Sequence, residues 1–174
     1  SGQRVDATDP SLRGAGLRWI PVPHAGNGPR SREEAEVVAG LVADLAGRPW
    51  TDASGVTRPI TVEDIIVVAP YNAQVAEIQT AIHGRIGRRG NVGTVDKFQG
   101  RQAPVVFVSM TASSADDVPR GIAFLLNRNR LNVAVSRAKY LSVIVQSPLL
   151  TEYLPGTPDR LVELGAFLSL GGVG

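Results

Sequence analysis

One arginine among small residues is the strongest candidate for chemistry in this sequence. Arg137 stands in the run LNVAVSRAK, where its neighbours are small. A guanidinium is always charged and offers a planar fork of N–H donors, so it suits a phosphate oxygen. If residues 121–139 are helical throughout, Asn127 and Arg130 share a face with Arg137, because seven residues make about two turns. The alternative is a solvated basic face, which would not need small neighbours.

A second group of polar residues lies between two apolar segments, in the run VGTVDKFQGRQ. Thr94 offers a hydroxyl and an N–H group to a phosphate of a nucleic-acid strand. Asp96 and Gln99 have the spacing of a capping box, which predicts a short helix. Gly100 can end that helix in the left-handed conformation. The alternative is a capped turn without a ligand, which does not explain so many polar residues between two apolar strands.

A third segment, IIVVAPYNAQ, combines a buried strand with the start of a helix. The strand ends at Pro70, and Asn72 is expected to cap the helix. A helix start has free N–H groups and a positive dipole end, which suit a phosphate. Tyr71 could pack on a base or a sugar. The alternative is a plain strand–turn–helix with Tyr71 at the edge of the core.

Apolar runs and helical periodicity indicate the elements that position these residues. Runs rich in β-branched residues predict strands buried on both faces at residues 65–69, 103–110 and 140–146. Shorter strands are expected at residues 17–22 and 92–95. Helices are expected from Ser31 and Asn72, within residues 121–139 and over residues 161–168. Strands that alternate with amphipathic helices predict an α/β fold, with a mostly parallel sheet and helices on both faces.

Local patterns refine two of these elements and two connections. Ser31 and Glu34 have capping-box spacing, so each side chain should bind the N–H group of the other residue. Residues 48–59, rich in Pro, Gly, Ser and Thr, are expected to form a loop. Residues 84–90, which include Arg85, Arg88 and Arg89, are expected to form a solvated basic turn rather than a phosphate contact.

Composition fits one α/β domain. The chain has 174 residues, of which 43% are apolar and 20% charged, and it has no cysteine. A disulfide framework and a thiolate metal site are thereby excluded. His24 and His83 are isolated in the sequence, so no metal site is predicted. No apolar run approaches the roughly 20 residues of a membrane span, and a cytoplasmic protein is expected. We expect an entry arm at residues 1–16 and a single domain at residues 17–174.

The order and spacing of the three segments resemble a known family. VVAPYNAQ, VGTVDKFQGRQAPVVFVSM and RLNVAVSRAK are similar to motifs IV, V and VI of superfamily 1 helicases. The pattern is most similar to the Upf/Dna-type branch, whose members usually move 5′ to 3′. The run APVVFVSM…PRGIAFLLNRNRLNVAVSRA resembles bacterial proteins that join a RecB-like nuclease to such a helicase. The resemblance covers residues 61–146, about half of the chain, and implies a RecA-like fold of the P-loop NTPase type.

The resemblance implies nucleotide contacts for four residues. Arg137 corresponds to the motif VI arginine finger, which reaches the γ-phosphate of ATP across an interdomain cleft. Arg130 is a candidate for a second contact in that cleft. Gly100 corresponds to the motif V glycine near the γ-phosphate. Gln102 stands where many relatives have a glutamate that holds the ribose hydroxyl, and a glutamine can accept that hydrogen bond only without the charge.

The resemblance also implies contacts with a nucleic-acid strand. The residues that correspond to backbone contacts of a single strand are Pro70, Tyr71, Asn72 and Thr94. Asp96 and Gln99 correspond to positions that couple the strand side of the domain to the ATP side. Single-stranded nucleic acid is therefore the expected partner, and the similarity to nuclease fusions favours DNA and repair-like processing.

One motif that ATP binding requires is absent from the sequence and is expected in another domain of the same protein. It contains no phosphate-binding loop of the form G-x-x-x-x-G-K-[ST]. The resemblance therefore implies that a preceding RecA-like domain of the same protein holds Mg²⁺ and most of the ATP phosphates. This chain alone is expected to lack ATPase activity. Two other classes stay open: a non-hydrolytic nucleic-acid-binding module that keeps the fold, and a nucleotide-binding α/β domain of unrelated chemistry.

Overall fold

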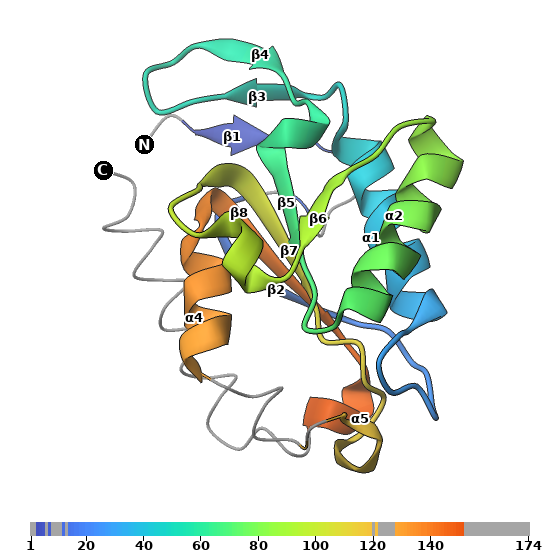
Figure 1. Cartoon of the computed structure of the whole chain (residues 1–174). Helices are drawn as coiled ribbons and strands as arrows, with labels where there is room; N and C mark the ends of the chain where they lie inside the picture. The colour runs from blue at the N-terminus through green and yellow to red at the C-terminus, as the bar shows by residue number, and fades with distance from the viewer. Residues whose placement is uncertain are drawn as a thin grey trace.

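A five-stranded parallel sheet forms the centre of the molecule, in the order β2-β8-β7-β5-β6 (Figure 1). The computed structural model describes residues 3–5, 7, 12, 14–119, 121 and 128–151. The strands of this sheet are β2 (Gly16–Pro21), β5 (Ile65–Val68), β6 (Asn91–Gly93), β7 (Ala103–Ser109) and β8 (Ala138–Gln146). Every neighbouring pair in the sheet is parallel. The predicted α/β fold with a mostly parallel sheet is confirmed.

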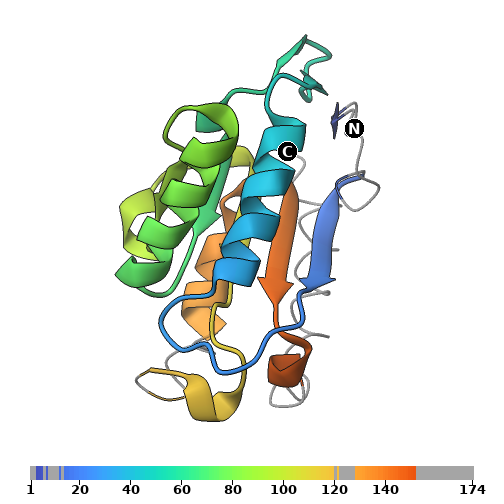
Figure 2. The same ribbon diagram turned by 90° about the vertical axis from the view of Figure 1, so that its right-hand side faces the viewer.

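Helices cover both faces of this sheet. The helices α1 (Arg32–Leu45) and α2 (Asn72–Ile86) lie side by side on one face, and α4 (Arg128–Ser136) lies on the other (Figures 1 and 2). The shorter elements are η2 (Val62–Asp64), η3 (Val95–Phe98), η4 (Ala115–Asp117) and α5 (Pro148–Thr151). This three-layer arrangement is that of a RecA-like domain. None of the described helices has the length and apolar character that crossing a membrane requires.

Two hydrophobic cores lie on the two faces of the sheet, because successive residues of a strand point to opposite sides. Val67 and Phe107 belong to the core under α1 and α2. Val106 and Val108 belong to the core that includes Leu131 of α4. Every residue of β5 and β7 is buried, as predicted for strands covered on both faces.

The two long helices begin at the expected places, but their caps differ from the prediction. The Oγ atom of Ser31 accepts a 3.2 Å hydrogen bond from the N–H group of Glu34, which confirms half of the predicted capping box. The other half is wrong, because the N–H group of Ser31 donates to Oε1 of Gln74 at 2.7 Å. The cap of α2 is Tyr71, whose backbone is extended. Asn72 is therefore the first helical residue, and its predicted capping role is wrong.

One predicted turn and one predicted strand are shorter than expected. The helix α2 continues through Ile86 and ends at Gly87, which has a φ of 72°, so the basic turn expected at residues 84–90 starts at Gly87. Gly87 adopts the left-handed conformation in which glycine commonly ends a helix. β6 ends at Gly93 and does not reach residue 95.

The short helix predicted after β6 forms, but with different caps. It is the 3-10 helix η3, with Thr94 at its N-cap and Gln99 at its C-cap. The capping box predicted from Asp96 and Gln99 is therefore wrong, because Asp96 already lies within the helix. Gly100 follows with a φ of 76°, which confirms the predicted left-handed residue.

The helix before β8 ends earlier than predicted. α4 ends at Ser136, and β8 begins at Ala138, where it pairs with Ala103 of β7. Arg137 therefore lies in a turn, and the prediction of one helix through residue 139 is wrong. Pairing within the sheet overrides the local helical pattern at this point. Asn127, the side chain of Arg130 and the helix predicted at residues 161–168 lie outside the described residues.

A small antiparallel sheet stands at the amino ends of the parallel strands (Figure 1). Its strands are β1 (Arg4–Val5), β3 (Pro49–Thr51) and β4 (Thr57–Pro59), in the order β1-β3-β4. The loop predicted at residues 48–59 is therefore wrong, since a hairpin occupies most of it. Trp50 is buried, and the guanidinium carbon of Arg58 lies 5.1 Å from the centre of its ring. Val5 and Leu12, within the predicted arm, are also buried.

Candidate functional site

The predicted site residues lie at opposite ends of the parallel sheet. Pro70 and Thr94 follow the carboxyl ends of β5 and β6. Gln102 and Arg137 directly precede the amino ends of β7 and β8. In Figure 1 the first end lies beside the start of α2, and the second lies near the small antiparallel sheet. The structure thus separates the residues expected to hold a strand from those expected to contact ATP.

A pocket at the carboxyl ends of β5 and β6 contains two of the expected strand contacts. Val68 pairs with Gly93, and the next residue, Ala69, donates its N–H group to the C=O group of Gly93 at 3.1 Å. This pairing brings Pro70 and Thr94 to one site. The pocket is lined by Val68, Ala69, Pro70, Thr94, Val95, Val108, Ser109, Met110, Leu131 and Ala134. A mainly apolar wall with the hydroxyl group of Thr94 suits the face of a base or a sugar.

Tyr71 and Asn72 follow Pro70 at the start of α2. The hydroxyl group of Tyr71 donates a 3.2 Å hydrogen bond to the C=O group of Pro119, and the residue is half-buried. Asn72 is exposed. Tyr71 therefore connects the start of α2 to the segment after η4, a contact for which the sequence gives no local signal.

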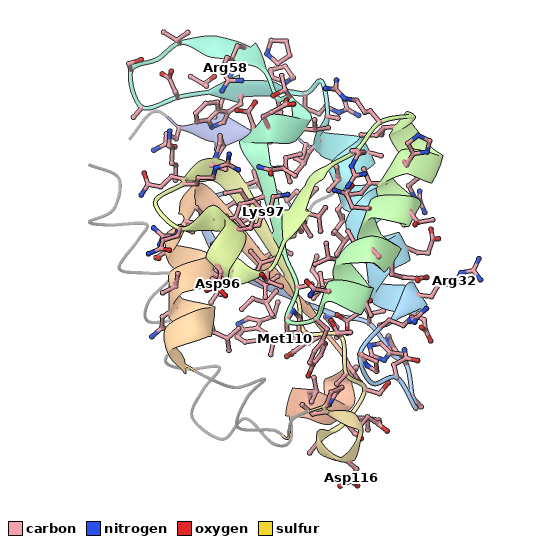
Figure 3. All side chains as sticks on the ribbon, viewed as in Figure 1. Arg32, Arg58, Asp96, Lys97, Met110 and Asp116 are labelled. Carbon is pink, nitrogen blue, oxygen red and sulfur yellow. The ribbon has the colours of Figure 1, made fainter. Side chains whose placement is uncertain are left out.

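The η3 turn after β6 is closely packed. A Cβ atom on Gly93 would lie 2.4 Å from Cδ of Lys97, and Nζ of Lys97 donates to a carbonyl group of β6 at 2.9 Å. Phe98 is fully buried in the core under α4. Asp96 and Gln99 are exposed, and Figure 3 shows Asp96 and Lys97 on this turn near α4. The side chains of Asp96 and Gln99 are therefore accessible to a second domain or a strand.

The expected nucleotide contacts meet at the amino ends of β7 and β8. The N–H group of Ala103 donates to the C=O group of Arg137 at 2.9 Å, so Gln102 and Arg137 lie side by side although they are far apart in sequence. Gly100 precedes them. No heavy atom lies within 4 Å of a Cβ atom added to Gly100. This position therefore needs glycine for its left-handed backbone, and not for space.

The guanidinium group of Arg137 contains an unsatisfied donor. The residue is half-buried, and its Nε atom is buried without a hydrogen-bond partner among the residues that the structure describes. Leaving a buried donor unpaired is costly, more so for a charged group. Because the residue as a whole is only half-buried, part of it stays accessible to a ligand that brings an acceptor, such as a phosphate oxygen.

A polar pocket of about 420 Å³ lies beside Gln102. Its lining residues are Val62, Glu63, Ile66, Arg89, Gly90, Asn91, Arg101 and Gln102. Two arginines and two amides among them can bind an anionic or hydroxyl-rich ligand. Gln102 itself is exposed, so its amide is accessible from outside the domain.

Comparison with known proteins identifies the family. Residues 25–148 match the model of a family described as an AAA domain, over more than half of the chain. The chain belongs to this AAA domain family. The matched residues include both ends of the sheet described above.

Several proteins similar to this AAA domain are named as helicases. It is 44% identical over 86 residues to DNA polymerase alpha-associated DNA helicase A of Schizosaccharomyces pombe, covering 49% of this chain and 12% of that protein. It is 35% identical over 92 residues to the regulator of nonsense transcripts 1 homolog of Drosophila melanogaster, covering 49% and 8%. It is 33% identical over 99 residues to RNA helicase Mov10l1 of Mus musculus, covering 55% and 8%. The chain thus spans about a tenth of these relatives, and the similarity identifies a helicase-type domain.

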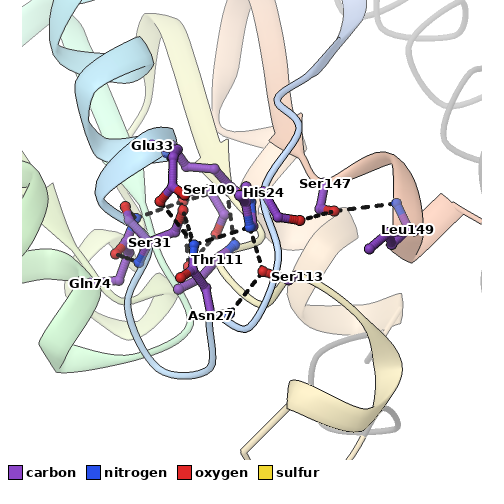
Figure 4. Close-up of polar contacts among 11 residues, drawn as sticks. His24, Asn27, Ser31, Glu33, Gln74, Ser109, Thr111, Ser113, Ser147 and Leu149 are labelled. Carbon is purple, nitrogen blue, oxygen red and sulfur yellow. Dashed lines mark hydrogen bonds and ion pairs between the residues drawn. The ribbon is translucent and has the colours of Figure 1, made fainter.

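One buried polar cluster of the AAA domain was missed by the sequence analysis. We name it the His24–Glu34 cluster, and its members are His24, Asn27, Ser31, Glu34, Gln74, Ser109, Thr111 and Ser113 (Figure 4). His24 was expected to be isolated, but its Nε2 atom lies 2.6 Å from Oε2 of Glu34. The sequence did not predict the pair of His24 and Glu34, because the spacing of Ser31 and Glu34 is typical of a capping box. Among the described residues, no group of three His, Cys, Asp or Glu could hold a metal ion.

Proposed function

We propose that this AAA domain is the second, C-terminal RecA-like half of the motor of a superfamily 1 helicase of the Upf/Dna-type branch. The observation that carries the proposal is the position of Pro70 and Thr94 at one end of the sheet and of Gln102 and Arg137 at the other. A helicase motor must hold a strand and a nucleotide at separate places on one rigid body. Closure around the nucleotide then moves the strand.

Arg137 is the proposed arginine finger for the γ-phosphate of ATP. The residue is half-buried, and its Nε atom has no hydrogen-bond partner among the described residues, so its guanidinium group is not committed to a carboxylate of this domain. A finger stabilises charge in the loose transition state of phosphoryl transfer and is typically worth ~10³-fold or more in rate. Gly100, Gln102 and Arg130 complete the proposed nucleotide side. ATP supplies the phosphoryl group, and a preceding RecA-like domain would hold it with Mg²⁺, because this sequence has no phosphate-binding loop.

The strand side is proposed to lie at the carboxyl ends of β5 and β6. The proposed contacts are Pro70, Tyr71, Asn72 and Thr94. The start of α2 offers N–H groups and a positive dipole end to a phosphate, and the neighbouring pocket offers an apolar wall to a base or a sugar. Residues 94–102 run from the end of β6 to the start of β7, so one segment connects both sides. Asp96 and Gln99, exposed on this segment, are the proposed coupling residues.

The proposed partners are single-stranded DNA and the preceding RecA-like domain of the same protein, with a RecB-like nuclease domain as a further one. Under this division of labour the isolated chain lacks ATPase activity. A non-hydrolytic nucleic-acid-binding module is the second candidate function. It is favoured by Gln102, an uncharged residue where many helicases of the resembled branch have a glutamate.

Replacement of Arg137 in the full-length protein tests the proposal. R137A should lower ATP turnover by ~10³-fold or more, whereas the affinity for a labelled oligothymidylate should stay that of the wild type. R88A is the matched control, because the side chain of Arg88 is 61% exposed and pairs with that of Glu63 at a long distance of 3.7 Å. Unchanged ATP turnover in R137A would overturn the assignment of Arg137 as the arginine finger. Strand binding by the wild type without any ATP turnover would identify the non-hydrolytic module.

A further inference from the structure

The centre of the His24–Glu34 cluster is a carboxylate with no exposure to solvent. The side chains of His24 and Glu34 are both 0% exposed, and Nε2 of His24 lies 2.6 Å from Oε2 of Glu34. The other oxygen, Oε1, accepts from Oγ of Ser109 at 2.8 Å and from the N–H group of Thr111 at 3.0 Å. Burying a carboxylate is costly unless its oxygens are hydrogen-bonded. Here both oxygens are occupied, so the cluster is a specific structure and not a chance contact.

A buried amide extends the cluster to the start of α2. Oε1 of Gln74 accepts from the N–H group of Ser31 at 2.7 Å, and Nε2 donates to the C=O group of Ser31 at 3.0 Å. The same Nε2 atom lies 3.2 Å from Oγ of Ser109. Gln74 therefore fixes the first turn of α2 to the cap of α1 and to the end of β7. Tyr71 and Asn72 lie at the start of that turn.

The chain after β7 has an unfavourable backbone conformation that the cluster holds in place. Thr111 has a φ of 74°, and it is the only residue other than glycine with a positive φ in the described part of the chain. A β-branched residue in this region is strained and persists only where its surroundings fix it. Its N–H group is bound by Glu34, and Nδ1 of His24 lies 2.6 Å from Oγ of Ser113 on the same segment.

The cluster and the carboxyl-end pocket share one residue. Ser109 lines the pocket together with Met110, and its hydroxyl group bonds to Glu34 and lies 3.2 Å from Nε2 of Gln74. The cluster therefore sets one wall of the pocket through Ser109. It sets the neighbouring start of α2 through Gln74. None of its members lines the polar pocket beside Gln102 at the other end of the sheet.

We propose that His24, Glu34 and Gln74 are positioning residues for the strand-binding end of this domain. They hold the start of α2 and the wall after β7 in the arrangement that grips a single strand. The inference rests on the proposed strand-binding function of this end. Loss of these side chains weakens strand binding and leaves the half-saturating ATP concentration unchanged, because the nucleotide side lies at the opposite end of the sheet.

The helix α2 contains a matched pair of glutamines for the test. Gln79 bridges the N–H and C=O groups of Gly90 at 2.9 and 2.7 Å, as Gln74 bridges those of Ser31. In the full-length protein, Q74L should raise the Kd for a labelled oligothymidylate by about fivefold or more, the effect of losing one or two hydrogen bonds. Q79L should lower the melting temperature as well but keep the wild-type Kd. The half-saturating ATP concentration should be unchanged in Q74L.

A second pair of variants separates positioning from loss of folding. E34L removes every acceptor of the carboxylate and should raise the Kd as Q74L does. E34Q keeps an oxygen for Ser109 and Thr111 and offers its NH₂ group to Nε2 of His24, which a change of imidazole tautomer permits. E34Q should therefore restore strand binding to within about twofold of the wild type.

The outcomes distinguish the inference from the proposed function. A folded Q74L with wild-type strand affinity would overturn the positioning role, and so would equal rises in Kd for Q74L and Q79L. A wild-type protein that does not bind the oligothymidylate would overturn the proposed function itself. A raised Kd in Q74L and E34L, with E34Q and Q79L at the wild-type value, would support the inference.

Discussion

The backbone N–H group of Ala103 donates a 2.9 Å hydrogen bond to the C=O group of Arg137. This bond opens the pairing of β7 with β8, whose register shifts between Ala103 and Val105. Irregular pairing of this kind re-aims side chains and is frequent beside functional sites. The backbone of Arg137 is therefore held on both sides, by the sheet through Ala103 and by α4 through the C=O group of Ala134, to which its N–H group donates at 3.2 Å. Gln102, the neighbour of Ala103, is held by the same bond.

Replacing Gln102 with glutamate should tighten nucleotide binding. A charged acceptor forms a stronger hydrogen bond with a ribose hydroxyl than an amide oxygen does. Q102E in the full-length protein should lower the half-saturating ATP concentration by about two- to tenfold, while the Kd for single-stranded DNA stays unchanged. Steady-state ATPase assays measure the first quantity, and fluorescence anisotropy measures the second. An unchanged or higher half-saturating concentration would remove Gln102 from the nucleotide side.

Two replacements of Tyr71 should distinguish the contribution of its ring to strand binding from that of its hydroxyl group. Stacking of a base on an aromatic ring is worth about 1–3 kcal/mol by alanine substitution. Y71A should therefore weaken the binding of an oligothymidylate by about fivefold or more. Y71F keeps the ring and loses the 3.2 Å bond to the C=O group of Pro119, so it should bind nearly as the wild type does. Equal losses in both variants would indicate that the hydroxyl contact, and not the ring, holds the strand.

Replacing Gly100 with alanine should destabilise the domain through its backbone alone. Gly100 has a φ of 76°, and an added Cβ atom meets no heavy atom within 4 Å. The left-handed conformation costs an alanine about 1 kcal/mol or more. G84A is the control, since Gly84 lies within α2, also has space for a Cβ atom and has no positive φ. G84A should stabilise the domain by about 0.4–1 kcal/mol. Urea unfolding of both variants measures the two opposite signs.

Acid should remove the stabilisation contributed by Asp64. Burial raises the pKa of its carboxyl group, but hydrogen bonds from Arg58, at 2.6 and 2.7 Å, and from Thr61 outweigh burial and lower the pKa below its ordinary value. A lowered pKa in the folded state stabilises the protein above the ordinary aspartate pKa of about 4, and this contribution is lost as the pH falls through the folded-state value.

Melting temperatures of D64N and the wild type, measured from pH 6 down to pH 3, check this prediction. D64N should melt at a lower temperature at pH 6, and the difference should shrink as the pH falls. D44N is the control, because Asp44 pairs with the half-exposed Arg48 at a longer distance of 3.7 Å. A constant difference between D64N and the wild type across this range would contradict the assigned pKa.

Local sequence patterns were sufficient for the elements of the central sheet. The apolar runs at residues 65–69 and 103–110 predicted buried parallel strands, because a strand covered on both faces has no need for polar alternation. The left-handed Gly100 and the capping hydroxyl of Ser31 were also predictable. Each of these features depends on neighbours within a few residues, so the sequence itself contains the information.

The tertiary structure decided the features that depend on distant partners. The carboxylate of Glu34 could accept a hydrogen bond from the N–H group of Ser31 or from distant donors. It accepts from Ser109 and Thr111, because they are buried beside it. Arg137 left the predicted helix because the next residue, Ala138, pairs with β7. Both outcomes are competitions between a local and a distant hydrogen bond. The spacing of residues in the sequence indicates only the local hydrogen bond. Burial makes it costly to leave the distant hydrogen bond unmade, and this cost is set by the tertiary structure.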